Sequence, residues 1–305
     1  MKEITAKKVR KLIPELRPDM HKYSRGLCDL MVGSERYPGA AILASRAANV
    51  MGAGYVRVYT YSSAAEALRV VQPSAVCVSE AEYIMDTHES SATHPMASVI
   101  GCGLTCSALS NNMMAPEVVT THRVLDALRI TKAPVVIDGG GLAALAADEA
   151  QEILTTRRHN GYPTIITPHI GEAALLLQAS GCAAKTAEEL CRGLAQYYQA
   201  VCVLKGPDTY IADMGAFTDD DVYIMREGTA ALAKAGTGDV LAGLLGSLLA
   251  QQLSPLDAAR LATFVHARAG VLAQEKYGIC ATTEHILDLI PEAVRSLGAK
   301  GYLAR

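Results

Sequence analysis

Short apolar runs alternate with longer helical stretches along most of the chain, and this alternation limits the possible folds more than any other feature. The sequence predicts six buried strands, over residues 29–33, 55–59, 97–101, 134–138, 163–167 and 200–206. They lack a regular apolar–polar alternation, as is typical of parallel strands covered on both faces. Helical spacing separates them at residues 40–51, 117–130, 171–180 and 186–199. This order predicts an α/β fold, a three-layer αβα sandwich with a mostly parallel central sheet.

The pattern changes after Gly206. Residues 209–213 and 222–225 are predicted to form a hairpin-like pair joined by the acidic turn "GAFTDDD". Three further helices are expected over residues 237–251, 255–275 and 283–296. We find no linker or internal repeat, so we expect an N-terminal helical segment over residues 1–20 and one domain over residues 21–305.

Composition excludes several classes of partner. The chain has 305 residues, is 50% hydrophobic and carries a formal net charge of −3, so no basic stripe invites nucleic acid. The longest apolar run, residues 240–253, contains glycines and is too short to cross a membrane. The N-terminus lacks the apolar core of a signal peptide, and the eight cysteines show no zinc-ligand spacing. We therefore expect a reduced, cytoplasmic protein.

Ligands of open parallel sheets bind beyond the carboxyl ends of the strands. Glycine and polar residues follow five of the predicted strands, at Gly33-Ser34, 101–103, 138–141, Pro168-His169 and Lys205-Gly206. A single glycine there explains only a turn, but five such ends together favour a ligand cleft.

The segment "AKAGTGDVLAG" carries the strongest candidate chemistry. Gly236 and Gly238 give the backbone freedom to approach a ligand, and the helix that begins near Thr237 offers unpaired N–H groups to an anion. Asp239 lies in the first turn of that helix. It is either a carboxylate that favours the helix dipole or a general base beside a bound phosphoryl group.

Three other motifs have both a structural and a functional interpretation. In "TPHIGE", His169 ends a strand, and Glu172 either favours the helix dipole or holds Mg²⁺ through water. In "VLKGPDT", Lys205 and the turn after it could meet a nucleotide phosphate or ribose, although a plain β-turn explains "GPDT" equally well. In "YPGAA", small residues such as Ala40 allow either close ligand approach or tight helix packing.

Taken in order, "GSERYPGAA", "IGCGL", "TPHIGE", "VLKGPDT" and "LAKAGTGDVLAG" resemble the ADP- or ATP-dependent NAD(P)H-hydrate dehydratases of the ribokinase-like superfamily. The resemblance runs from about His21 to Pro291. It implies a repair reaction in which ADP or ATP phosphorylates the hydroxyl of hydrated NADH or NADPH, and loss of phosphate restores the ring double bond. Relatives tend to form homotetramers. The epimerase domain often fused to such enzymes is not expected here.

The resemblance also implies a role for each motif. Asp239 would activate the hydroxyl as the catalytic residue. The substrate site would include Ala40, Gly103, His169 and Asp239, and Glu172 would assist Mg²⁺. The nucleotide would be bound by the remaining residues of two loops, namely Lys205, Gly206, Pro207, Asp208, Thr209, Gly236, Thr237 and Gly238.

The chain departs from the family pattern at five places, one of which is Ile170, where the family usually has a proline. Cys102 replaces a proline, Ala235 replaces a glycine, and Gly139–Gly141 lacks a second carboxylate usually found there. Residues 226–229 lack the usual asparagine. Two rival functions therefore stay open: a small-molecule kinase of the same superfamily, such as one acting on hydroxymethylpyrimidine or hydroxyethylthiazole, or a nucleotide-binding relative without turnover.

Overall fold

A ten-stranded sheet runs through the centre of the computed structural model, which describes residues 1–107 and 115–298. The described strands are β1 (Lys2–Glu3), β2 (Leu27–Met31), β3 (Tyr55–Thr60), β4 (Val76–Ser79), β5 (Met96–Ile100), β6 (Val135–Ile137), β7 (Thr164–Ile166), β8 (Val201–Leu204), β9 (Thr209–Ala212) and β10 (Tyr223–Met225). Their order across the sheet is β1-β10-β9-β8-β7-β6-β5-β2-β3-β4. The seven strands from β8 to β4 in that order are parallel, and β9 is antiparallel to both of its neighbours.

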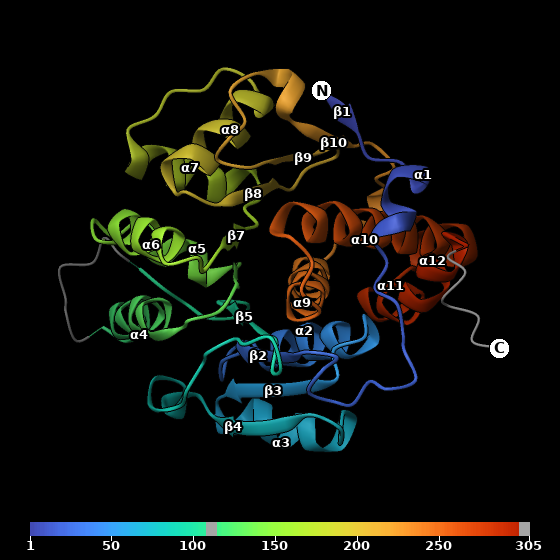
Figure 1. The fold of residues 1–305 in the computed structure, drawn as a ribbon, viewed down its shortest axis with the longest axis horizontal. Coiled ribbons are helices and arrows are strands. Elements are labelled where there is room, and N and C mark those ends of the chain that lie inside the picture. The colour runs from blue at the N-terminus through green and yellow to red at the C-terminus, as the bar shows by residue number, and fades with distance from the viewer. Residues whose placement is uncertain (108–114, 299–305) are drawn as a thin grey trace.

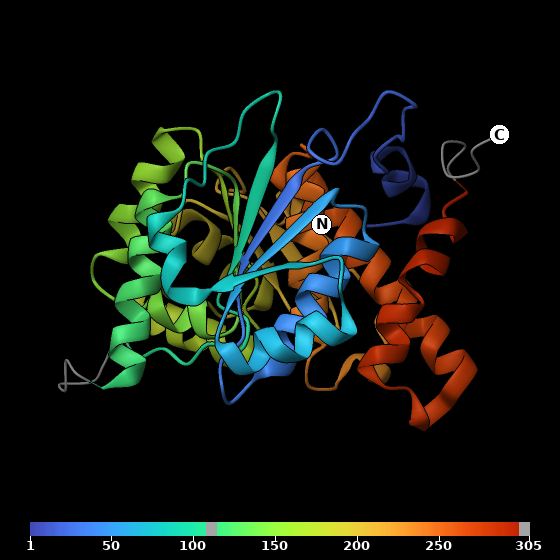
Figure 2. The same cartoon turned by 90° about the horizontal axis from the view of Figure 1, so that it is seen from below.

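Helices cover both faces of this sheet (Figures 1 and 2). The described α-helices are α1 (Ala6–Val9), α2 (Pro38–Val50), α3 (Ser62–Val71), α4 (Pro116–Ile130), α5 (Gly140–Ala144), α6 (Ala150–His159), α7 (Ile170–Ser180), α8 (Ala187–Tyr197), α9 (Thr237–Ala250), α10 (Pro255–Tyr277), α11 (Thr283–Asp288) and α12 (Ile290–Ser296). Helices α2, α9 and α10 pack on one face and α4 to α8 on the other, each over its own apolar cluster. The predicted three-layer αβα sandwich with a mostly parallel sheet is confirmed.

Helix α9 is the element that places the site, and it is buried along nearly its whole length. Two of its glycines let it lie against its neighbours at backbone distance. A Cβ atom at Gly243 would come within 2.1 Å of the Ala44 carbonyl oxygen in α2, and one at Gly246 within 2.3 Å of Val99 in β5. Helix α9 is therefore held between α2 and the sheet, which fixes the position of its amino terminus.

Several elements differ from the sequence-based expectation. Residues 1–20, expected to be helical, also contain β1, which pairs with β10, and Ile4 and Val9 lie in the main core. Strand β4 was not expected, because its four residues form a short edge strand that is exposed at both ends. The single helix expected over 283–296 is two helices, α11 and α12, because Pro291 lacks the N–H that would continue the first one.

The hairpin-like pair after Gly206 is confirmed as β9 and β10, with a short 3₁₀ turn (Asp219–Asp221) between them. All eight cysteines are free thiols. Among the described residues, no helix combines the length and apolar character needed to cross a bilayer.

Candidate functional site

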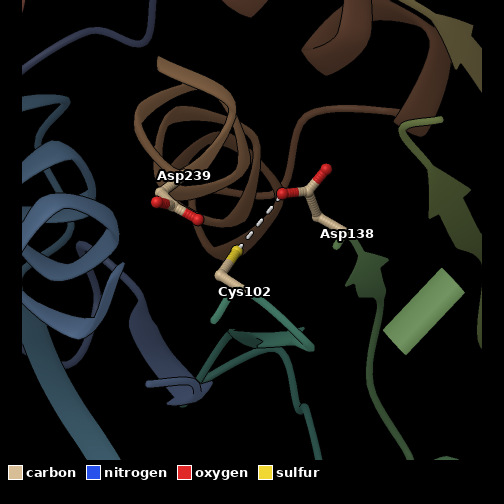
Figure 3. A group of neighbouring side chains, drawn as sticks. All are labelled: Cys102, Asp138 and Asp239. Atoms are coloured by element: carbon tan, nitrogen blue, oxygen red, sulfur yellow. Dashed lines mark hydrogen bonds between the residues drawn. The ribbon is translucent and has the colours of Figure 1, made fainter. Parts of the chain in front are cut away.

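The carboxyl ends of four neighbouring parallel strands bring together residues that are distant in sequence. Cys102 follows β5, Asp138 follows β6, Thr167 follows β7 and Lys205 follows β8. The amino terminus of α9 lies at the same edge and contributes Asp239. Ligand-type atoms of Cys102, Asp138 and Asp239 lie within 4.8 Å of one another (Figure 3). The predicted edge is therefore a real cluster of polar groups.

Asp138 and Lys205 form the centre of this cluster. The Lys205 ammonium donates to Asp138 Oδ1 at 2.6 Å, and the Thr167 hydroxyl donates to the same oxygen at 2.6 Å. Burial alone would raise the pKa of Asp138, but the charge of Lys205 and these hydrogen bonds outweigh it and hold the pKa below its usual range. Burial likewise opposes the charge of Lys205, but Asp138 and Glu172 raise its pKa. Both groups are therefore ionised.

His169 and Glu172 cap the amino terminus of α7 in a reciprocal arrangement. The Glu172 N–H donates to His169 Nδ1 at 3.1 Å, and the His169 N–H donates to Glu172 Oε2 at 2.7 Å. That carboxylate oxygen also lies 3.9 Å from Lys205 Nζ. Burial and the charge of Asp138 raise the pKa of Glu172, against the opposing effect of Lys205. The two predicted residues thus adjoin the cluster, with Glu172 linked to its central lysine.

The loop before α9 presents its backbone to the cluster. Gly236 has a φ of 91°, a left-handed conformation that strongly favours glycine, and it is the N-cap of the helix. Gly238, in contrast, has helical geometry, so it does not supply the backbone freedom that was expected of it from the sequence. A Cβ atom there would lie 3.3 Å from Lys205 Nζ, so glycine leaves room beside the lysine. The free N–H groups of the first turn and the lysine together favour an anion.

Asp239 has an unusual charge environment for a first-turn aspartate. Burial raises its pKa most, the neighbouring charge of Asp138 raises it further, and Lys205 and the Cys102 thiol only partly offset these effects, so the pKa reaches about 7. A carboxylate with a pKa near 7 is suited to accept a proton at neutral pH. A position in the first helical turn by itself lowers the pKa of an aspartate, so burial and the charge of Asp138 outweigh that effect here.

The small residues Ala40 and Gly103 lie against each other at the rim of the cluster. A Cβ atom at Gly103, whose φ is +69°, would come within 2.5 Å of the Ala40 Cβ. The Ser34 hydroxyl donates to the Gly103 carbonyl oxygen at 2.7 Å and ties the two loops together. Gly103 directly follows Cys102, so this rim adjoins the cluster that contains Asp138 and Asp239.

The turn between β8 and β9 contains the predicted nucleotide residues Gly206, Pro207 and Asp208. A Cβ atom at Gly228 would lie 2.6 Å from the Pro207 carbonyl oxygen, so the segment before α9 rests on this turn. Lys205 begins the turn, and its Nζ atom lies 3.3 Å from the place that a Cβ atom at Gly238 would occupy. The two groups of predicted nucleotide residues therefore meet at Lys205.

Two residues beside the site were not assigned a role from the sequence. Asp138 was noted only as a retained carboxylate, although its position directly after a strand was a usable signal. His266 in α10 carried no signal, since a lone histidine in a helix is usually structural. Burial lowers its pKa to about 4, and Nε2 is buried with no hydrogen-bond partner among the described residues. Its neutral ring therefore adds no positive charge near Lys205.

One departure from the family pattern has a steric explanation. A Cβ atom at Gly140 would lie 2.1 Å from the Leu104 carbonyl oxygen, so the turn after β5 leaves no room for a side chain there. Gly101, with a φ of +114°, packs equally closely on the Asp138 carbonyl oxygen. The glycines of "DGGGL" and the turn of "GCGL" therefore pack closely against each other.

The fold and this edge define an α/β protein of the ribokinase-like class. Residues 28–292 match the family described as NAD(P)H-hydrate dehydratase. The chain belongs to this family. The chain is similar to a solved structure of an ADP/ATP-dependent NAD(P)H-hydrate dehydratase from Bacillus subtilis, co-crystallised with ATP and Mg²⁺, and the match covers 97% of this chain and 98% of that one. The sequence identity is 25% and the TM-score is 0.77.

Two sequence relatives place the chain within the family. It is 31% identical to an ADP-dependent (S)-NAD(P)H-hydrate dehydratase of Bacillus subtilis, over 79% of this chain and 78% of the relative. It is 32% identical to a bifunctional NAD(P)H-hydrate repair enzyme of Thermofilum pendens, over 76% of this chain. The aligned part spans only 42% of that bifunctional protein.

Proposed function

We propose that this protein uses ADP or ATP to dehydrate hydrated NADH or NADPH, and so returns a damaged cofactor to its active form. The main support for this proposal is Asp239, a carboxylate with a pKa of about 7 in the first turn of α9, beside N–H groups that favour an anion. A base next to a phosphate site is the arrangement that phosphoryl transfer to a hydroxyl requires. Family membership supplies the substrate class.

In the proposed reaction, Asp239 accepts the proton of the ring hydroxyl as the hydroxyl oxygen attacks the terminal phosphorus of the nucleotide. The bond from that phosphorus to the bridging oxygen breaks, which leaves AMP from ADP or ADP from ATP. The carbon–oxygen bond of the phosphorylated ring then breaks, phosphate leaves with the electron pair, and a proton is lost from the adjacent ring carbon. This sequence restores the double bond of the reduced nicotinamide.

The nucleotide residues act by binding and charge. The N–H groups of Gly236, Thr237 and Gly238 hold the transferring phosphoryl group, and Lys205 lies within reach of the same place. Lys205, Gly206, Pro207, Asp208 and Thr209 bind the adenosine phosphate. Because Asp138 keeps Lys205 ionised, the lysine carries a fixed positive charge toward the phosphates.

The proposed substrate residues lie at the same edge of the sheet as the base. Ala40 and Gly103 pack against each other next to Cys102, and neither has a long side chain. His169 is 60% exposed, so its ring can contact a bound nicotinamide nucleotide. In this arrangement the hydroxyl reaches Asp239 from the rim, and the nucleotide reaches it from the Lys205 side.

Magnesium fits this site through Glu172 rather than through the Cys102, Asp138 and Asp239 group. A protonated thiol is a poor ligand for Mg²⁺, and Asp138 Oδ1 is already bound to Lys205. Glu172 Oε2 accepts the His169 N–H, and the side chain is 21% exposed, which suits contact through water. When bound, the ion would neutralise charge on the nucleotide phosphates.

The test is recovery of the reduced nicotinamide absorbance when the protein is incubated with hydrated NADH or NADPH, Mg²⁺ and either ADP or ATP. We expect recovery with at least one nucleotide and none without nucleotide. Absence of recovery with both nucleotides contradicts the proposal. Phosphorylation of a hydroxymethylpyrimidine or hydroxyethylthiazole alcohol in its place would indicate a kinase, and nucleotide binding alone would indicate a relative without turnover.

The cytoplasmic location and the homotetramer are part of the same proposal and rest on composition and on the family resemblance. Fractionation of cells and light scattering of the purified protein test them. A membrane-bound fraction or a monomer would contradict the respective part.

A further inference from the structure

The side chain of Cys102 lies between the two carboxylates of the cluster, and the proposed reaction gives its thiol no role. Cys102 follows the end of β5 and is completely buried. Figure 3 shows its sulfur between Asp138, which comes from the end of β6, and Asp239, which comes from α9. Ligand-type atoms of the three side chains lie within 4.8 Å of one another, so both carboxylates adjoin the thiol.

This thiol is a hydrogen-bond donor toward a carboxylate. Its sulfur donates to Asp138 Oδ2 at 3.5 Å. Burial raises the pKa of Cys102 well above its ordinary value, and the charges of Asp138 and Asp239 raise it further, so the thiol keeps its proton. A protonated thiol is a poor nucleophile and a poor metal ligand, but its S–H group can still donate a weak hydrogen bond. Donation to a neighbouring carboxylate is therefore the chemistry that this position allows.

Asp138 does not depend on the thiol, because it has stronger partners. Its Oδ1 atom accepts from Lys205 Nζ and from the Thr167 hydroxyl, both at 2.6 Å. The ammonium of Lys205 also balances the negative charge of this carboxylate. Charge-assisted hydrogen bonds of this length are much stronger than a bond from a neutral thiol. The hydrogen bond from Cys102 can therefore turn away from Asp138 at little cost.

Asp239 has a greater need for a donor. Burial raises its pKa most and the charge of Asp138 raises it further, whereas Lys205 and the Cys102 thiol lower it. Lys205 is already paired with Asp138, so it only partly balances an ionised Asp239. The thiol has no such prior ion pair. Of the two groups that favour the charged form of Asp239, the thiol is therefore the one whose hydrogen can turn to it.

The helices that pack against α9 bring no competing charge. In α10, burial lowers the pKa of His266 to about 4, so its ring is neutral. In α2, the guanidinium of Arg46 is bound to Asp288 of α11 at 3.0 Å. The Thr283 hydroxyl of α11 donates to the backbone of the loop before α9 at 2.9 Å. The interaction between Cys102 and Asp239 can therefore be tested without a second titrating group from these helices.

We propose that Cys102 is a positioning residue, whose S–H group turns from Asp138 to Asp239 when Asp239 is ionised and holds that carboxylate in place to accept the substrate proton. The reason is electrostatic, because Lys205 balances the charge of Asp138 and leaves Asp239 as the stronger acceptor. Once Asp239 has taken the proton, the S–H group turns back to Asp138. The movement is a rotation about the Cβ–Sγ bond, and no covalent bond changes. This inference rests on the proposed function, since it takes Asp239 as the base.

The S–H stretching band of Cys102 in the infrared tests this hydrogen bond, whether or not the protein is active. The spectrum of the unmodified protein minus that of Cys102→Ala isolates the band. We expect it to move to lower frequency as the pH rises through about 7, because the hydrogen bond becomes stronger when Asp239 ionises. In Asp239→Asn, the band should stay at one frequency. A band that does not move with pH in the unmodified protein would overturn the inference.

The pH dependence of turnover gives a second test. In Cys102→Ala, the ionised Asp239 loses a donor, so the acid limb of kcat/KM should shift to higher pH. We expect the loss of kcat/KM to be roughly threefold greater below pH 7 than above it, as for one weak hydrogen bond. Cys102→Ser keeps a hydroxyl donor and should restore the unmodified pH dependence. Cys28→Ala removes another completely buried thiol, in β2, and is the matched control, which should leave the pH dependence unchanged.

Two kinetic results would overturn the inference. A loss in Cys102→Ala that is the same at every pH would indicate a packing defect, and so would an equal loss in Cys102→Ser. If the unmodified protein restores no hydrated NADH or NADPH, the proposed function fails instead. The infrared band still decides in that case whether the thiol follows the ionisation of Asp239.

Discussion

Two carboxylates, the buried Asp29 and the partly buried Asp239, lie in the same fold but in opposite charge environments. Asp29, within β2, is fully buried and accepts two hydrogen bonds from Arg57 at 2.9 and 2.6 Å. Its Oδ2 atom also lies 2.7 Å from His88 Nδ1. Asp239 shares its surroundings with a second carboxylate, Asp138, which already binds the nearest lysine.

We propose that this difference separates a charge that supports folding, on Asp29, from one that takes part in the reaction, on Asp239. The hydrogen bonds to Asp29 hold β2, β3 and the segment at His88 together, so the carboxylate contributes to folding. The raised pKa of Asp239 means that folding disfavours its charged form, and the neighbouring residues leave it ready to accept a proton. Four experiments test the different roles of Asp29 and Asp239.

The largest effect is expected for Asp239→Asn. The amide cannot accept the hydroxyl proton, so turnover of hydrated NADH should fall roughly a thousandfold, within the usual range for loss of a general base. Steady-state recovery of absorbance measures this. Binding of ADP or ATP, followed by titration calorimetry, should change little. Near-normal turnover in the variant would mean that Asp239 is only a helix-dipole partner.

Asp29→Asn should mainly reduce stability. Removing one partner of a buried ion pair leaves Arg57 without its carboxylate and lowers the free energy of unfolding by about 3 kcal/mol. Urea unfolding measures the change. The matched control is Asp126→Asn, which removes an exposed pair with Arg129 and should lower stability by less than about 1 kcal/mol. Equal effects in the two variants would refute the structural role of Asp29.

The pH dependence of activity should follow Asp239. Its carboxylate must be ionised to accept a proton, so kcat/KM should rise with pH up to about 7 and level off above it. Below pH 7 the rate should fall about tenfold per pH unit. Rates measured between pH 5.5 and 8.5 test this, and a constant rate down to pH 5.5 would contradict the raised pKa.

The smallest effect concerns stability against pH. The folded pKa of Asp239 lies above its ordinary value of 3.8, so the folded state binds this proton more tightly and stability falls as pH rises from about 4 to about 7. Asp239→Asn removes this loss of folding stability, because an amide does not titrate in this range. Its Tm should exceed that of the unmodified protein by roughly 5 °C at pH 8. The two Tm values should converge near pH 4, and an equal or lower Tm at pH 8 would argue against burial of the charge.

Much of the fold follows from local patterns. The six predicted strands correspond to β2, β3, β5, β6, β7 and β8, because buried parallel strands are apolar runs that can be recognised without tertiary information. Strand β1 was missed because a two-residue edge strand has no periodicity and exists only through its pairing with β10. Pro291 was visible in the sequence, and its effect on the last helix could have been predicted.

The candidate site also contains some features that local sequence patterns predict and others that they do not. The loop around Gly236, the strand ends and Asp239 could be identified because turn glycines, helix starts and strand ends have sequence signals. The link between Lys205 and Asp138 had no such signal, since the two residues are 67 positions apart.

The layers of the fold, the edge proposed for ligand binding and the residue types present there could be predicted from the sequence, because these depend on local hydrophobicity and backbone preference. Tertiary structure alone decided the charge state of each group. The pKa of Asp239 depends on Asp138 and Lys205, which reach it from other strands, and on burial by packed helices. Electrostatic effects act over distances in space, so a base could be distinguished from a helix-dipole carboxylate only after the chain had been folded.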